Sequence, residues 1–190
     1  MLFKIMAVCF IVSILVGCGV STKPTPQNIQ TYHNEFKELR KWNHPPDIRG
    51  YRAKEMVEYF NAILPPTFQL RYDASEIKNP LTPKRGEIKI SKLGKSKWPK
   101  KLKAGMTTQG IATSYYEGRS VVKGRILMDV ESTGSCLFDG TLRHEMMHAL
   151  GFLGAHVETF SDSILQSDCS GRNPNLTDID KAALRKLYEN

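Results

Sequence analysis

The chain has 190 residues, of which 41% are hydrophobic, and it carries a formal net charge of +8 at pH 7. A chain of this length suits one domain with a substantial hydrophobic core. It contains no internal repeat, so a repeat architecture is excluded.

The N-terminal residues are typical of an export signal. Lys4 precedes an apolar run from Ile5 to Val16 that is too short for an ordinary membrane span, and Cys18 follows it closely. The stretch resembles a bacterial lipoprotein signal peptide, which implies that residues 1–17 are removed and that Cys18 is lipidated. By the same resemblance, Gly19 after the cysteine implies sorting to the outer membrane, facing the periplasm or the cell surface. The alternative is a plain apolar anchor helix.

Removal of the signal lowers the formal net charge to +7, because Lys4 is its only charged residue. The residues that follow include two prolines, so we assign residues 18–30 to a lipidated tether and residues 31–190 to a single domain. Apolar residues at helical spacing predict a helix from Ile29 to Trp42 and another from Tyr51 to Leu64, each ended by two prolines.

Short strands are predicted in the middle of the chain. Alternating side chains indicate strands at Phe68 to Tyr72 and at Gly86 to Ile90. Two further strands, Gly110 to Tyr116 and Arg125 to Val130, could pair in an antiparallel manner across the segment from Gly118 to Gly124.

A basic segment from Lys84 to Lys103 holds nine basic residues and one acidic residue, Glu87. With Trp98 among them, these residues could contact anionic lipid headgroups, an acidic polymer or an acidic substrate, or they could form a solvated loop. Nucleic acid is not expected as a partner outside the cytoplasm. His33 and His44 are expected to be surface or packing residues.

The segment from Asp139 to Gly151 is predicted to be a helix with a buried side. Asp139 is a candidate N-cap and Gly151 a candidate stop. The apolar stripe consists of Thr141, Leu142, Met146, Ala149, Leu150 and Leu153.

This predicted helix carries the pattern His-Glu-x-x-His. Four residues apart, His144 and His148 project from the same helical face, where one tetrahedral ion can bind both imidazoles. His156 follows as a third candidate ligand, and three protein ligands leave the fourth position of zinc to a water with a pKa of about 7. Glu145 would stand beside that water as general base. The alternative is a core helix whose histidines only satisfy hydrogen bonds.

From here the chain resembles the metzincin metalloproteases, and within them the matrixin-like type. His144 to Gly151 matches the first part of their extended zinc motif, and Ser161 to Leu165 is similar to the turn beneath the zinc. Leu176 to Tyr188 is similar to their closing helix. The resemblance implies an α+β fold, with a twisted mixed sheet, an active-site helix and a C-terminal helix.

The same resemblance assigns roles to two upstream elements. The helix predicted at Tyr51 to Leu64 would be the long helix that packs against the sheet. The strand predicted at Arg125 to Val130 would be the edge strand bordering the cleft, where an extended peptide can add as a further strand.

The chain departs from the family pattern in two places. Gly154 stands where the third ligand is expected, so His156 is the nearest replacement, and Glu158 or Asp162 are alternatives because carboxylates also bind zinc. Leu165 stands where the turn usually has methionine, and an apolar residue of similar size should be tolerated there.

The cysteines fit an oxidising compartment. Cys9 leaves with the signal and Cys18 carries lipid, so Cys136 and Cys169 remain as one pair. A disulfide between them would brace the site and contribute at most about 4 kcal/mol. The alternative is two unrelated buried thiols.

These observations together predict a zinc-dependent endopeptidase, lipid-anchored and monomeric, with a peptide or protein substrate. His144, His148 and His156 would bind Zn²⁺, and Glu145 would be the general base for the zinc-activated water. The main alternative is a non-catalytic metzincin-like protein that holds a peptide or partner in its cleft. Hydrolysis of another amide, such as one in cell-wall peptide, is a third interpretation.

Overall fold

The structure is a computed structural model that describes residues 23–36, 38–99, 109–130, 138–154, 156–166 and 174–189. The predicted signal peptide, the lipidation residue Cys18 and the predicted disulfide pair Cys136 and Cys169 lie outside the described residues. The elements in chain order are α1 (Pro26–Asn34), β1 (Glu38–Leu39), β2 (Lys41–Trp42), β3 (Asp47–Gly50), α2 (Ala53–Asn61), β4 (Arg71–Asp73), β5 (Glu87–Leu93), the short 3-10 helix η1 (Lys95–Lys97), β6 (Gly110–Glu117), β7 (Ser120–Asp129), α3 (Phe138–Ala149), β8 (Phe152–Leu153) and α4 (Asp178–Tyr188).

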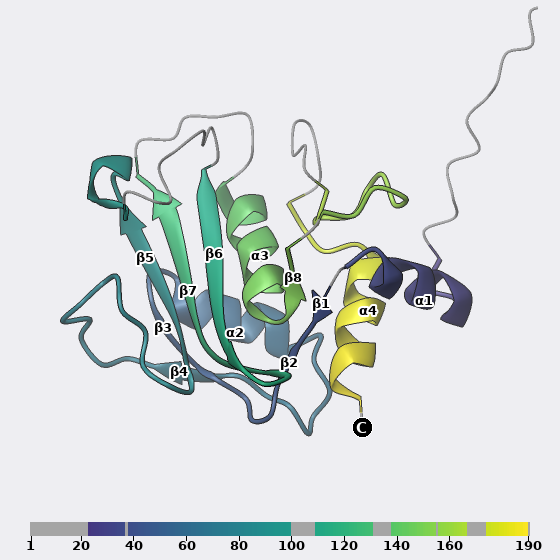
Figure 1. Cartoon of the computed structure of the whole chain (residues 1–190), viewed down its shortest axis with the longest axis horizontal. Helices are drawn as coiled ribbons and strands as arrows, with labels where there is room; N and C mark the ends of the chain where they lie inside the picture. The colour runs from purple at the N-terminus through teal and green to yellow at the C-terminus, as the bar shows by residue number, and fades with distance from the viewer. Residues whose placement is uncertain are drawn as a thin grey trace, which may run out of the picture.

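A mixed sheet of six strands forms one layer of the protein, with the helices α1 to α4 on one side of it (Figure 1). Its strand order is β2-β7-β5-β3-β4, all paired in parallel, and β6 pairs antiparallel with β7. A separate two-stranded sheet joins β1 to β8. The α+β class that we predict is confirmed, as are the mixed sheet, the helix that carries the histidines and the C-terminal helix.

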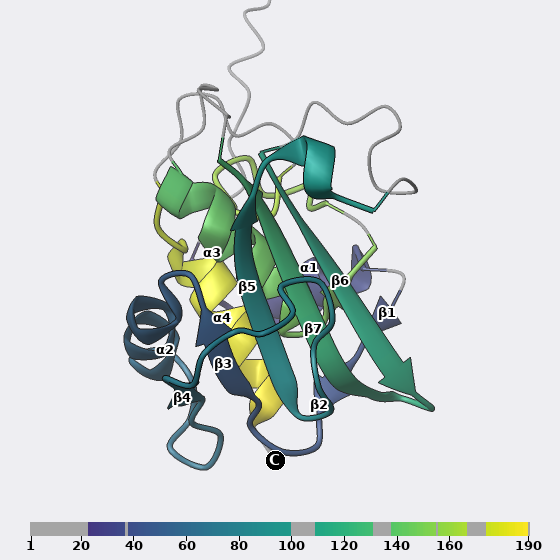
Figure 2. The same ribbon diagram turned by 90° about the vertical axis from the view of Figure 1, so that its left-hand side faces the viewer.

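The helices lie on one side of the sheet, with α2 and α3 against it and α1 packed on α4 farther away (Figures 1 and 2). Buried isoleucines of the central strands, among them Ile48, Ile88 and Ile126, form one core with Phe60 of α2 and Met146 of α3. This core fixes the helix α3 against the sheet, and α3 carries the candidate site.

The opposite face of the sheet is covered by the segment between β4 and β5, which crosses the strands in Figure 2. Buried cationic side chains of the strands donate to its backbone carbonyls. Lys89 Nζ lies 2.9 Å from the carbonyl oxygen of Asn79 and 2.6 Å from that of Thr82, and Arg125 bonds the carbonyl of Leu81 at 2.9 Å. Hydrogen bonds from polar side chains therefore hold this irregular segment on a face of the sheet that apolar packing would otherwise have to cover.

The helix predicted from Ile29 to Trp42 is wrong in its second half. Thr25 caps α1, since its Oγ1 accepts the N–H of Asn28 at 3.1 Å, and the helix ends at Asn34. The residues beyond it enter two sheets instead, because long-range pairing outweighs their helical spacing. The helix also begins at Pro26, so residues 26–30 of the predicted tether are helical.

The other predicted helix and the strands are shorter or longer than expected. The helix at Tyr51 to Leu64 is found as α2, and the strand at Phe68 to Tyr72 is reduced to β4. The antiparallel pair is confirmed, but β7 begins at Ser120, so the predicted connection of seven residues is a tight turn at Gly118, which has φ +57°.

The predicted edge strand is also wrong. The strand containing Arg125, β7, lies inside the sheet between β5 and β6, whereas β6 pairs with β7 alone among the described strands. The sequence contains a signal for this order: Ile126, Leu127 and Met128 are consecutive and all fully buried, as is typical of an interior strand. The strand edge near the site therefore belongs to β6.

The basic segment does not present its tryptophan to a partner. Trp98 is 2% exposed and donates its indole N–H to the carbonyl of Leu93 at 3.1 Å. Lys89, from the same segment, is buried as described above. Within the described residues, no helix is both long enough and apolar enough to span a membrane.

Candidate metal centre

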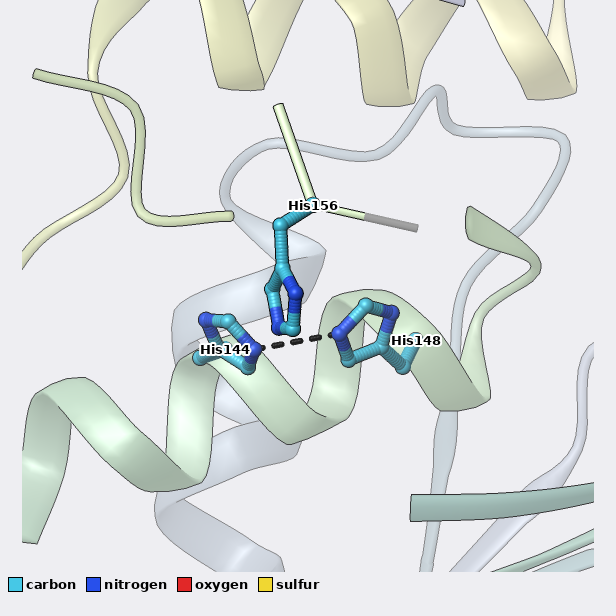
Figure 3. Close-up of side chains that lie close together, drawn as sticks. All are labelled: His144, His148 and His156. Carbon is cyan, nitrogen blue, oxygen red and sulfur yellow. Dashed lines mark hydrogen bonds between the residues drawn. The ribbon is translucent and has the colours of Figure 1, made fainter. Parts of the chain in front are cut away.

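Helix α3 places two imidazoles side by side (Figure 3). His144 and His148 are one turn apart, and their ring centroids are separated by 4.7 Å. Asp139 lies within the first turn of α3, one residue after Phe138, so it is not the N-cap that the sequence suggests. Its carboxylate instead pairs with Arg52, which precedes α2, and this ion pair joins the starts of the two helices.

The chain reverses directly after α3 and returns to the histidines. Gly151 has φ +120°, and a Cβ placed on it would lie 1.8 Å from the carbonyl oxygen of Arg40, so only glycine fits the close approach. Gly154, with φ +75°, makes a second bend. These bends bring His156 over the helix. Its ring centroid lies 5.2 Å from that of His144 and 5.6 Å from that of His148.

The three histidines form a group whose ligand nitrogens all lie within 4.8 Å of one another. Among the described residues, no carboxylate joins this group, so Glu158 and Asp162 are not needed as third ligand. His156, the displaced histidine chosen from the sequence, is the residue that the fold brings to the other two.

Backbone carbonyls orient two of the rings. His144 Nδ1 lies 2.6 Å from the carbonyl oxygen of Ile164, and His148 Nδ1 lies 2.5 Å from that of Phe152. A carbonyl only accepts, so each Nδ1 carries the hydrogen in a neutral ring and each Nε2 keeps its lone pair. The two Nε2 atoms are 3.0 Å apart, within hydrogen-bond distance (Figure 3), but with the hydrogen of each neutral ring on Nδ1 neither can donate, so the two lone pairs can share a cation. The donor set thus fits a metal ion such as zinc, which prefers imidazole nitrogen.

The protonation of the site favours the same interpretation. Burial lowers the pKa of His148 to about 4, against the opposing effect of its bond to Phe152. The ring is therefore neutral at ordinary pH, which is the form that binds a metal.

Glu145 follows His144 in α3 and does not belong to the group of possible ligands. Its side chain is buried, and its Oε2 accepts the N–H of Ala112 in β6 at 2.6 Å. Burial raises the pKa of Glu145 to about 7, although the bond from Ala112 acts in the opposite direction. Because Ala112 donates away from β7, this bond also places Glu145 on the side of β6 along which no described strand pairs.

The turn from Ser161 to Leu165 lies against the site and is tied to α4. Leu165 is fully buried, and its carbonyl accepts the N–H of Val157 next to His156. Asp180 of α4 accepts from the Ser163 hydroxyl at 2.6 Å and from the Ile164 N–H at 3.0 Å.

Sequence reasoning missed these supporting groups. The contacts of Phe152 and Ile164 are made by backbone carbonyls, which carry no side-chain signal. For Asp180, the only signal in the sequence was its place near the start of the segment from Leu176 to Tyr188, which is similar to the family's closing helix. His33 and His44 are apart from the metal centre, as expected: His33 Nε2 bonds the carbonyl oxygen of Ala183 at 2.9 Å, and His44 is exposed.

No protein-family model matches the chain, and no curated protein matches it significantly. The α+β fold and the geometry of the three histidines are consequently the observations on which a functional conclusion depends.

Proposed function

We propose that the protein is a zinc metalloendopeptidase of metzincin type, anchored to a bacterial membrane by lipid on Cys18. The observation that carries the proposal is the convergence of His144, His148 and His156, with Glu145 adjacent to them and outside the ligand group. Zinc bound there supplies a Lewis acid that polarises a carbonyl and lowers the pKa of a coordinated water to about 7.

Residues of the chain itself would transfer the protons and bind the substrate. Glu145 is held against β6 through one carboxylate oxygen, so its second oxygen would take the proton from the attacking water and later deliver it to the leaving amine. The free edge of β6 runs past Glu145, and its backbone groups would bind an extended peptide as an added strand. Such binding uses mainly backbone atoms, which favours a peptide substrate over other amides.

The proposal is tested with Glu145→Ala, assayed on an unfolded protein and with zinc content measured in parallel. We expect proteolysis to fall by about 100- to 10,000-fold while zinc stays bound. The matched control is Glu58→Gln, because Glu58 is an exposed acid on α2 outside the histidine group, and its replacement should leave the rate unchanged. Proteolysis by the wild type that survives Glu145→Ala would show the mechanism to be wrong.

A non-catalytic binding protein is the second candidate, motivated by the displaced His156 and by Leu165 in the turn. It would bind zinc and hold a peptide but turn over no peptide in a library. Release of an amine from cell-wall peptide, without cleavage of unfolded protein, would instead identify a different amide substrate.

A further inference from the structure

The residues that follow α1 lie along both sides of the loop that carries His156. Before the histidine, Leu39 pairs with Phe152 in the β1–β8 sheet, and the adjoining residue Arg40 donates its N–H to the carbonyl of Gly151 at 3.1 Å. After the histidine, the chain is fastened again by Glu35. The loop is thus attached twice to one short stretch of chain, with His156 between the attachments.

The second attachment is made by a single carboxylate oxygen. Glu35 Oε2 accepts the backbone N–H of Glu158 at 2.5 Å and that of Thr159 at 3.2 Å. Hydrogen bonds to an ionised acceptor are shorter and stronger than neutral ones. Two consecutive amides directed at one oxygen fix the direction of the backbone just beyond His156.

Glu35 lies at the C-terminal end of α1, a helix that packs on α4. It is the C-cap of α1, and the neighbouring aromatic side chains flank the loop: the ring centroids of Phe36 and Phe152 are 5.1 Å apart, edge-on, and those of Tyr32 and Phe160 are 5.7 Å apart. Tyr32 also donates its hydroxyl to Asp180 at 2.7 Å. The carboxylate therefore has a defined position relative to the loop.

The loop is held next to His156 by the bond from the Val157 N–H to the Leu165 carbonyl, and Glu35 adds a contact one residue farther along. Gly154 gives it conformational freedom, and His156 is exposed, so burial of its own ring does little to order it. If a ligand side chain becomes ordered only when the metal binds, the conformational entropy that it loses lowers the affinity for the metal. Groups that hold the ligand in place beforehand avoid this loss.

We infer that Glu35 is a positioning residue for the third metal ligand, acting through the amides of Glu158 and Thr159 on the orientation of His156. This inference rests on the proposed function, because it assumes that the three histidines bind zinc.

The test compares Glu35→Ala and Glu35→Gln with wild type in two measurements. The first is the dissociation constant for Zn²⁺, obtained by competition with a chelator. The second is amide hydrogen exchange at Glu158 and Thr159 in the metal-free protein, which needs no zinc. Asn34→Ala is the matched control, because Asn34 is the preceding, exposed residue and its side chain bonds Gln30 within α1.

We expect Glu35→Ala to raise the zinc dissociation constant by about 10- to 100-fold and to accelerate exchange at both amides. Glu35→Gln should fall between alanine and wild type, because its amide oxygen still accepts. In a His156→Ala background, Glu35→Ala should change the zinc dissociation constant by less than about twofold, since the ligand it positions is gone.

The outcomes separate the two proposals. If wild type binds zinc and Glu35→Ala leaves both its dissociation constant and the amide exchange unchanged, the inference is wrong and the proposed function stands. An equal loss of affinity with and without His156 also overturns it, because the effect would then be general destabilisation. If wild type binds no zinc, the proposed function fails and the role in ligand positioning fails with it, whatever the exchange rates show.

Discussion

Asp180 and His144 are joined through the backbone of one residue. Asp180 Oδ2 accepts the N–H of Ile164 at 3.0 Å, and the carbonyl oxygen of Ile164 lies 2.6 Å from His144 Nδ1. The C-terminal helix thus fixes the tautomer and direction of a candidate metal ligand through a peptide segment that has no side-chain role of its own.

Replacement of Asp180 by alanine should strongly destabilise the protein. The carboxylate is fully buried and accepts from Tyr32, Ser163, Ile164 and the capping residue Thr177, all of which would lose their acceptor. We expect the free energy of unfolding, measured by chemical denaturation, to fall by about 3 to 5 kcal/mol.

The control for this change is Asp178→Ala on the same helix. The Asp178 side chain is 78% exposed, so its removal should cost less than about 1 kcal/mol. Equal losses for the two variants would contradict the role of the buried network.

Chelation of the metal should lower the thermal stability of the protein. A ligand that binds only the folded state at 100 times its dissociation constant contributes about 2.7 kcal/mol. We expect the melting temperature to fall when zinc is removed and to recover on its return, and His148→Ala to abolish this response. A melting temperature that changes neither with chelator nor with added zinc would contradict a metal centre.

Gly151 should tolerate no side chain. Alanine there would meet the carbonyl oxygen of Arg40 in a backbone conformation of φ +120°, so we expect a loss of at least about 2 kcal/mol in the free energy of unfolding. Gly118→Ala is the comparison, because Gly118 also has positive φ but a Cβ added to it would meet nothing within 4 Å; this change should cost only about 1 kcal/mol. Similar losses at the two positions would show that the close approach is unimportant.

Lys89→Met should loosen the segment that covers the far face of the sheet. The change removes the ammonium bonded to Asn79 and Thr82 and leaves the buried Glu87 with one cation fewer. We expect about 3 kcal/mol of destabilisation and faster proteolytic cleavage between residues 74 and 86. Lys84→Met, at an exposed position, should change neither cleavage nor stability; cleavage as slow in Lys89→Met as in wild type would disprove the role of Lys89.

Local sequence was sufficient for the helix that carries the first two ligands. The spacing of His144 and His148, the apolar stripe and the glycine at 151 all act within a few residues, and α3 follows them. The helix α2 and the hairpin of β6 and β7 are predictable for the same reason, although their limits shifted.

The pairing of distant segments could not be predicted from local sequence. Leu39 and Trp42 have the spacing of a helical face, yet they pair with strands that come much later in the chain, at Phe152 and Val121. Likewise, the sequence indicates a solvated basic segment around Lys89 and a strand around Arg125. In the structure, the segment between β4 and β5 folds over both side chains, and both are buried.

The sequence by itself determined that His144 and His148 can bind one metal ion, because imidazoles one helical turn apart must share a face. The tertiary structure decided that His156 lies next to them, that β6 pairs with β7 alone among the described strands, and that Glu35 after α1 and Asp180 of α4 bond backbone amides near these histidines. These outcomes depend on which distant segments pair and pack, and the free energy of such contacts is absent from any short stretch of the chain.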